Sequence, residues 1–472
     1  MRLVKDLGIA GSLVLASTVF TAPQIHAQAA YVYVQSTASN GPVYGYSASS
    51  SGQLTAISGS PFKPGTAIVG STKTEFFTIG KTLLHSWSVG SNGAIGAQKS
   101  QIPFLSYSGS VCGNATYGRS DAVLDHSGQY IYVLLQGGTS GSCSAYQTFK
   151  ANSDGSFTFD GDSQVNTDPG GGTGLPSVLG SETYAYADEY SGHNNQIIGF
   201  QRQNIGTLQF FGGTNPSFSG SESYTPYHPD ASPTGSYVVI QELLNDSGYP
   251  QLGSFTVGSN GALTSTNTSS TMPTSGLQAI DSAFSPNGAM FALAGYGLSS
   301  DSGLEIYKFN GANPLTLYKK LLAGTPINQI AWDSSNHLYA ISGPTNKLYV
   351  FTVTPTSVVQ SASYSITSPD RLVVVSRTAS TCSAPSSNGV NVCAPAENAS
   401  VSSPVQVNAA ATVSGGVYRF ELWSGSTKLV SVDNSGVMNQ SVPLGAGTYH
   451  LTFVARNMAG TKVTATRDIS VK

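Results

Sequence analysis

Four polar residues occupy the same position in four related hairpin sequences, and together they could carry out chemistry. Each lies seven positions before the turn residue of its hairpin: Asp121 before Gly128, His228 before Gly235, Asp281 before Gly288 and Gln329 before Asn336. A histidine close to two carboxylates can act as a general base on a water that attacks a carbonyl carbon, such as that of a lactone. The same oxygen-rich group could instead hold a cation.

The hairpins that carry these residues share one pattern: a strand, a tight turn that needs Gly or Asn at a positive φ, and a second strand with alternating side chains. The four copies are LDHSGQYIYV (124–133), ASPTGSYVVI (231–240), FSPNGAMFAL (284–293) and WDSSNHLYAI (332–341). They recur about every 50 residues if the gap between the first two spans two units, which is the repeat length of propeller blades.

A second strand pair, ending in a Gly-x-Leu or Gly-x-Ile segment, follows each hairpin. Four strands per unit indicate a β-propeller. The units lie at about residues 30–62, 66–103, 117–165, 175–213, 226–269, 278–322 and 327–366. The first unit lacks an inner strand, so we assign residues 371–375 to that place, which closes the ring and leaves no free sheet edge. The alternative is that residues 368–371 form another hairpin turn.

The segments SVGSNGAI (88–95) and TVGSNGAL (256–263) are nearly identical and lie three units apart. Their Asn-Gly pairs predict a tight turn between the last two strands of the second and fifth blades.

The head of each inner strand faces the central channel of a propeller, so Asp121, His228, Asp281 and Gln329 should converge at one channel mouth. A simpler alternative is that they are solvated polar residues of the kind that line most propeller channels.

The two ends of the chain differ from this repeat. Residues 1–29 have the features of a signal peptide, with Arg2 and Lys5 before an apolar run and Ala27-Gln28-Ala29 after it, which predicts export to the periplasm or the outside. No later stretch reaches the roughly 18 residues that span a bilayer. The composition changes after residue 377. A linker (378–395) leads to five strand-like segments in residues 396–472, which predict a small Ig-like β-sandwich. The expected fold is therefore all-β.

Four cysteines in an exported chain indicate disulfides. Nearness in sequence favours pairing Cys112 with Cys143 and Cys382 with Cys393, and a zinc site is the alternative. The chain has a net charge of −3 and only 10% charged residues, with no Lys/Arg cluster, which argues against a nucleic-acid partner. We expect a monomer that needs no cofactor. Its ligand could be a small molecule, a cell-envelope carbohydrate or a protein.

The SPNG and SPTG turns, each followed by an alternating strand and a Gly-x-Leu strand, resemble the seven-bladed lactonase-like propellers related to 6-phosphogluconolactonase and muconate cycloisomerase. The resemblance covers residues 30–377, and the C-terminal part resembles bacterial Ig-like modules. In that propeller family a blade carries Arg-His at the head of its inner strand and Glu after the next strand. Here His228 matches the histidine, Glu242 lies within one residue of the acidic position, and Tyr227 replaces the arginine.

An arginine is the expected partner of a carboxylate or phosphate on a lactone. Its replacement and the Ig-like module favour a non-catalytic exported binding or scaffolding protein, with Asp121, Asp281 and Gln329 as ligand-binding residues. The alternative is a hydrolase or cyclase acting on a small sugar-derived or carboxylated lactone. In that enzyme His228 would be the base, supported by Glu242, Asp121 or Asp281.

Overall fold

The chain is described by a computed structural model, which covers residues 28–38, 41–105, 118–137, 143–165, 172–190, 196–214, 224–233, 236–244, 250–297, 302–376, 382, 384–401, 403, 405–433, 436–442 and 444–472. These residues form strands and no α-helix. Over the same ranges there is accordingly no helix long and apolar enough to cross a membrane.

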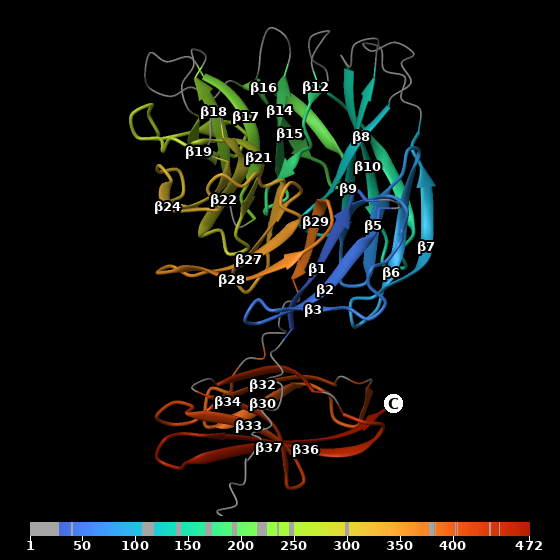
Figure 1. Cartoon of the computed structure of the whole chain (residues 1–472), viewed down its shortest axis with the longest axis vertical. Helices are drawn as coiled ribbons and strands as arrows, with labels where there is room; N and C mark the ends of the chain where they lie inside the picture. Colours follow the sequence, from blue (N-terminus) through green and yellow to red (C-terminus); the bar gives the residue numbers. More distant parts are fainter. Residues whose placement is uncertain are drawn as a thin grey trace, which may run out of the picture. The chain divides into compact units, whose positions relative to one another are not determined.

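Seven antiparallel sheets follow one another along the first part of the described chain, and each is a blade of a β-propeller (Figure 1). The first three blades are blade 1 with β29 (Pro369–Ser376), β1 (Gln28–Ser36), β2 (Val43–Ser49) and β3 (Leu54–Ala56), blade 2 with β4 (Ala67–Ser71), β5 (Glu75–Ile79), β6 (Leu83–Val89) and β7 (Ile95–Pro103), and blade 3 with β8 (Gly118–Leu124), β9 (Tyr130–Gly137), β10 (Cys143–Ala151) and β11 (Phe157–Val165).

The remaining four blades follow the same plan, except that two short inner segments pair with the second strand of blade 4. They are blade 4 with β12 (Gly172–Thr173), β13 (Ser177–Val178), β14 (Tyr184–Tyr190), β15 (Gln196–Arg202) and β16 (Leu208–Thr214), blade 5 with β17 (Tyr224–Ala231), β18 (Tyr237–Leu244), β19 (Gln251–Val257) and β20 (Leu263–Thr264), blade 6 with β21 (Leu277–Phe284), β22 (Met290–Gly297), β23 (Gly303–Lys308) and β24 (Thr316–Leu321), and blade 7 with β25 (Gln329–Trp332), β26 (His337–Ser342), β27 (Lys347–Val353) and β28 (Val358–Ser365).

The core of the propeller lies between the blades. Second strands such as β26 are buried along their whole length, whereas the outer strands β24 and β28 contain many exposed residues. Blade 6 contributes Ala292 and Ile306 to one apolar cluster, and blade 7 contributes Leu338 and Phe351 to it. Strands that are buried on both faces read as nearly continuous apolar runs, which is why the hairpins were recognisable in the sequence.

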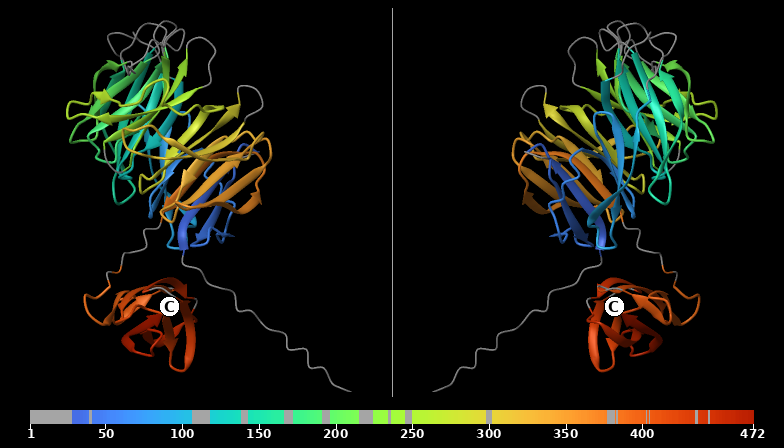
Figure 2. Two further views of the ribbon diagram at one scale, coloured as in Figure 1. Left: turned by 90° about the vertical axis from the view of Figure 1, so that its left-hand side faces the viewer. Right: turned by 90° about the vertical axis from the view of Figure 1, so that its right-hand side faces the viewer.

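The ring closes between the two ends of the propeller sequence. β29 pairs with β1 in antiparallel register, with Leu372 opposite Val34 and Val375 opposite Tyr31. The blue first strands accordingly lie beside the last strands of the ring in Figures 1 and 2. This pairing confirms residues 371–375 as the inner strand of blade 1, and it leaves no exposed edge on β1.

Adjacent blades are joined by tyrosines that donate to the backbone of a glycine turn. Hydrogen bonds run from Tyr33 Oη to Gly93 O (2.7 Å), from Tyr132 Oη to Gly206 O (2.8 Å) and from Tyr186 Oη to Gly261 O (2.7 Å). Each tyrosine lies on the second strand of one blade, and each glycine lies in the turn between the last two strands of the next blade.

The repeated GSNG segment supplies two of these turns, between β6 and β7 and between β19 and β20. Gly93 and Gly261 have φ values of 83° and 81°, whereas their Asn neighbours have ordinary negative values. A Cβ at Gly93 would lie 2.5 Å from the ring of Tyr31, and one at Gly261 would lie 2.9 Å from the ring of Tyr184. Glycine is required here both for its conformation and for the close approach of the neighbouring blade.

The contacts of the chain divide it into Ala27–Thr381 and a second unit that contains Cys382–Lys472. The second unit has two sheets. One contains β30 (Gly389–Ala394), β32 (Val405–Thr412) and β35 (Val437–Val442), and the other contains β31 (Ala399–Val401), β37 (Lys462–Val471), β36 (Gly447–Arg456), β33 (Arg419–Ser424) and β34 (Thr427–Asp433). Buried residues of both sheets, including Val407, Met438, Phe420 and Phe453, form one core, so the unit is a β-sandwich.

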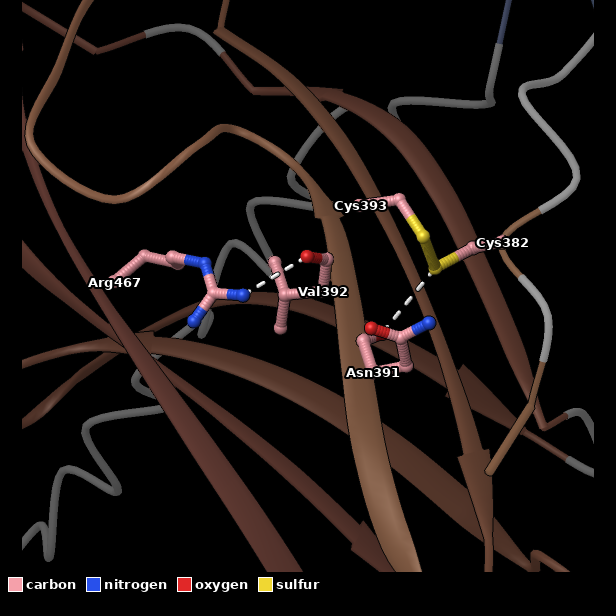
Figure 3. The surroundings of a disulfide bond; sticks show 5 residues. All are labelled: Cys382, Asn391, Val392, Cys393 and Arg467. Atoms are coloured by element: carbon pink, nitrogen blue, oxygen red, sulfur yellow. Dashed lines mark hydrogen bonds between the residues drawn. A yellow bond between two sulfur atoms is a disulfide. The ribbon is translucent and has the colours of Figure 1, made fainter. Parts of the chain in front are cut away.

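A disulfide links Cys382 to Cys393 at the start of this unit (Figure 3). Cys382 Sγ lies 3.3 Å from Asn391 O, and Arg467 Nη2 donates to Val392 O over 2.9 Å. Closing a loop of this length stabilises a fold by about 3 kcal/mol in the chain-entropy treatment. The predicted partner pair cannot be placed in the same way, because Cys112 and the side chain of Cys143 lie outside the described residues.

Candidate functional site

A cavity of 520 Å³ lies among the inner strands of blades 3 to 6. Its polar lining includes Ser177, Asp188, His228, Asp230 and Asp281, and its apolar lining includes Leu175. Cavities that hold small molecules have about this volume and a similar mixture of apolar wall and a few polar groups. The structure therefore brings two of the predicted residues, His228 and Asp281, to one cavity.

Irregularities in the inner strands place the side chains at this level. The antiparallel register shifts between Tyr227 and Asp230 in β17 and between Ala279 and Asp281 in β21. His228 lies within the first shift, with a φ of 45° and an exposed side chain. A bulge redirects side chains relative to the regular alternation of a strand, which is how two consecutive residues, His228 and Pro229, both line the cavity.

Asp230 lies on the same strand, two residues after His228. Ser177 Oγ in blade 4 donates to Asp230 Oδ1 over 3.3 Å and accepts the Ala231 N–H over 2.8 Å. Asp230 Oδ2 is buried and has no hydrogen-bond partner among the described residues. Burial, followed by repulsion from the Asp281 carboxylate, raises the pKa of Asp230 to about 8.

Asp281 connects blade 6 to blade 7. Its Oδ2 accepts the Ile330 N–H over 2.7 Å. Burial raises the pKa of Asp281 to about 7, although this hydrogen bond and one from the backbone of Ser282 act in the opposite direction. At neutral pH the two carboxyl groups therefore carry fewer than two negative charges, and a protonated carboxyl can donate a hydrogen bond as well as accept one.

Two further predicted residues, Asp121 and Gln329, are used to connect inner strands. Gln329 Oε1 accepts the Leu372 N–H over 2.5 Å, which joins blade 7 to blade 1. Arg371 Nη1 and Nη2 donate to the two oxygens of Asp121 over 2.8 and 3.0 Å, which joins blade 1 to blade 3. Together with Asp281, these residues connect the inner strands of blades 6, 7, 1 and 3.

His228 differs from the other three residues of the predicted group. Its contact with a described side chain is a ring contact with Tyr227, at 6.4 Å between ring centroids. No hydrogen bond to its imidazole occurs within the described part of the chain. Its imidazole is therefore available to a ligand or to a water molecule in the cavity.

Glu242 lies on β18 and is not among the described residues that line the cavity. It is completely buried, and neither of its carboxyl oxygens has a hydrogen-bond partner within the described ranges. Burial raises the pKa of Glu242 well above the usual range for a glutamate. The neighbouring Gln241 has a structural role, because its amide donates to Leu277 O over 2.9 Å and accepts the Ala279 N–H over 3.1 Å.

Sequence reasoning did not select Asp188 and Asp230, which line the cavity together with Asp125 and His126, or Arg371 on the inner strand β29. Asp188 lies on the second strand of blade 4 and reaches the cavity beside Gly174, where a Cβ would lie 2.1 Å from Asp188 Oδ1. Counting back from the turn selects one residue per blade, so on β17 it selected His228 and could not also find Asp230. Arg371 could have been found, because residues 371–375 had already been assigned to an inner strand.

Another arginine, Arg202, pairs with the cavity-lining residue Asp125, and its guanidinium already has several partners within the protein. Its Nη2 pairs with Asp125 over 3.1 Å, its Nη1 pairs with Glu182, and its guanidinium lies 4.6 Å from the centroid of the Tyr130 ring. Asp125 also accepts the N–H groups of Gln129 and Tyr130, as expected for an aspartate that begins a turn.

The described residues contain no group of three or more His, Cys, Asp or Glu side chains arranged to hold a metal ion.

Comparisons with known proteins show the fold. No protein-family model matches the chain, and no curated protein sequence matches it. A proposed 6-phosphogluconolactonase from Bacteroides fragilis is similar in structure, with 15% sequence identity and a TM-score of 0.52 over 74% of this chain and 98% of its own. A second one from Bacteroides uniformis has 14% identity and a TM-score of 0.54 over 74% and 100%.

The periplasmic gluconolactonase of Pseudomonas aeruginosa is similar to the same extent, with 17% identity and a TM-score of 0.52 over 73% of this chain and 99% of its own. At this level of identity the likeness concerns the arrangement of the blades. It supports the expected seven-bladed propeller fold and does not extend to the residues that line the cavity.

Proposed function

We propose that this lactonase-like β-propeller is a binding module that holds a small, uncharged, hydroxyl-bearing ligand in the cavity of blades 3 to 6. The observation that carries the proposal is the chemistry of the lining. Its described polar side chains are those of aspartate, histidine and serine, and none of its described residues is Lys or Arg.

Charge decides which ligands this lining favours. A phosphate or carboxylate group normally pairs with arginine or lysine. In this cavity it would instead meet Asp230 and Asp281. A hydroxyl group can donate to an ionised carboxylate and accept from a protonated one, and pKa values of about 8 for Asp230 and about 7 for Asp281 provide both forms near neutral pH.

The expected site of action is outside the cytoplasm. Residues 1–29 have the features of a signal peptide, and one structural neighbour is a periplasmic protein. A sugar or sugar-derived lactone of the cell envelope or the medium would have the required hydroxyl groups and no charge.

The proposal is tested by ligand binding to residues 30–472, measured by thermal shift and calorimetry with sugars, polyols, sugar lactones and sugar phosphates. We expect uncharged compounds to bind and their phosphorylated forms to bind at least tenfold more weakly. Asp230→Asn should weaken binding about tenfold, as expected when a hydrogen bond to a charged or buried group is removed. His450→Ala, an exposed position in the sandwich, is the matched control and should have no effect. Tighter binding of the phosphorylated forms would contradict the proposal.

Hydrolysis of an uncharged lactone is a second candidate, supported by the position of His228. Its imidazole lines the cavity and forms no hydrogen bond within the described residues, so it could remove a proton from a water that attacks the lactone carbonyl. The ring oxygen would then leave and take up a proton, giving the open-chain acid. Lactone turnover that disappears in His228→Ala would establish this reaction with His228 as the base. Turnover that persists in Glu242→Gln would show that Glu242 takes no part in it. Turnover unaffected by His228→Ala would exclude His228 as the base.

A further inference from the structure

Arg371 is the cationic side chain that the described inner strands bring into the channel. Strand β29 carries it, and no other inner-strand residue with a described side chain is Lys or Arg. Its side chain is 26% exposed, and that of its partner Asp121 is 31% exposed. The ion pair therefore lies at the solvent-accessible surface of the channel wall and is not sealed in the core.

The ion pair passes over an intervening blade. β4 contacts both β29 and β8 in the ring of inner strands, and Arg371 Nη1 lies 3.5 Å from Ile68 O of β4. Asp370 is a further acidic residue close to Arg371. Burial lowers the pKa of the Arg371 guanidinium, and the negative charge of Asp370 helps to raise it. The guanidinium reaches past β4 to Asp121, and both oxygens of that carboxylate accept from it, over 2.8 and 3.0 Å.

This bidentate arrangement is the one in which an arginine binds the carboxylate or phosphate of a ligand. Asp121 already accepts from the two guanidinium nitrogens, Nη1 and Nη2, that such a ligand would need. A ligand anion that displaced Asp121 would leave that carboxylate without its cationic partner. Displacement is therefore opposed by the loss of one ion pair.

We propose that Asp121 is a specificity-determining residue, an internal substitute for a ligand carboxylate that keeps Arg371 from binding anionic ligands in the channel. The inference deepens the proposed function and rests on the channel being a ligand site. It assigns the exclusion of anions to one residue, in addition to the lack of cations in the cavity lining.

The test compares gluconate with sorbitol, which has the same six-carbon chain but a primary hydroxyl in place of the carboxylate. Binding of both probes is measured by calorimetry at low ionic strength for residues 30–472, as wild type, Asp121→Asn and Asp121→Asn/Arg371→Gln. We expect Asp121→Asn to bind gluconate at least tenfold more tightly than wild type does, with sorbitol changed less than threefold. The double variant should lose the gain.

Equal gluconate affinity in the wild type and in folded Asp121→Asn overturns the inference, as does a gain that survives Arg371→Gln. Should Asp121→Asn not be recovered folded, Asp121→Ser, which also retains an acceptor for the Ala122 N–H, is judged by the same criterion. Failure of the proposed function is separately visible, because the wild type would then bind none of the uncharged compounds, whatever gluconate does in the variants.

Discussion

At the scale of single residues, the polar side chains of the channel divide into two groups. Asp281, Gln329 and Asp121 share in hydrogen bonds or ion pairs that connect inner strands. Oδ2 of Asp230 and the imidazole of His228 have no hydrogen bond from a described residue, although Oδ1 of Asp230 accepts from Ser177 of blade 4. Asp281 lines the cavity together with His228 and Asp230, so residues that join the blades also contribute to the cavity wall.

The raised pKa values of Asp230 and Asp281 predict how stability depends on pH. In the unfolded chain an aspartate has a pKa of about 3.9. Between about pH 4 and pH 8 the folded propeller therefore binds more protons than the unfolded chain, and its free energy of unfolding falls as pH rises. The slope is at most about 1.4 kcal/mol per pH unit for each carboxyl.

Asp230→Asn should reduce this fall between pH 5 and pH 8, because asparagine does not titrate. Denaturant unfolding at several pH values measures the effect. Asp154→Asn is the control, since its exposed carboxyl has a lowered pKa and stays ionised across this window. A variant profile that is parallel to that of the wild type would show that Asp230 titrates normally.

At the scale of elements, three junctions between adjacent blades are held by a tyrosine on the second strand of one blade and a glycine turn on the next. The two GSNG segments are therefore explained by packing between blades. The sequence predicted their place between the last two strands of the second and fifth blades, and the structure agrees. It did not reveal that the ring of Tyr31 lies where a Cβ of Gly93 would be.

Comparing Gly93→Ala with Gly65→Ala separates the two reasons why glycine is required at such turns, which are its positive φ and the close approach of a neighbouring side chain. Both residues have a positive φ, of 83° and 75°, but a Cβ at Gly65 has no atom within 4 Å. We expect Gly65→Ala to cost about 1 kcal/mol for its conformation alone. Gly93→Ala should cost about 3 kcal/mol or more, because it also forces apart the packing with Tyr31. Equal losses in the free energy of unfolding would mean that the close approach contributes nothing.

At the scale of the whole molecule, closure of the ring depends on a strand that lies more than 300 positions away in sequence from its partner. β1 is almost fully buried between β29 and β2. Without β29 its backbone would present an unpaired, apolar edge, which is a template for aggregation.

Two truncations test this closure. Residues 30–381 retain β29 and lack the β-sandwich, and we expect them to give a monomeric propeller with one cooperative thermal transition. Residues 30–366 retain every strand of the other six blades but lack β29, and we expect them to aggregate or to melt at a much lower temperature. Size-exclusion chromatography and circular dichroism distinguish the outcomes. A stable monomer of residues 30–366 would show that closure through β29 is dispensable.

The sequence by itself determined the all-β class, the repeat and its seven units, and the strand that closes the ring, because these depend on local alternation and on turn residues such as Gly128 and Gly288. It also grouped His228 with Asp281, and both residues line the cavity of blades 3 to 6. Only the tertiary structure decided which polar side chains already have hydrogen-bond or ion-pair partners, because the partners of Asp121 and Asp281 come from other blades. It also decided that Asp230 reaches the cavity, because this depends on a bulge in β17. Pairing across the ring joins residues with no local sequence relation, and no periodicity in one strand can reveal it.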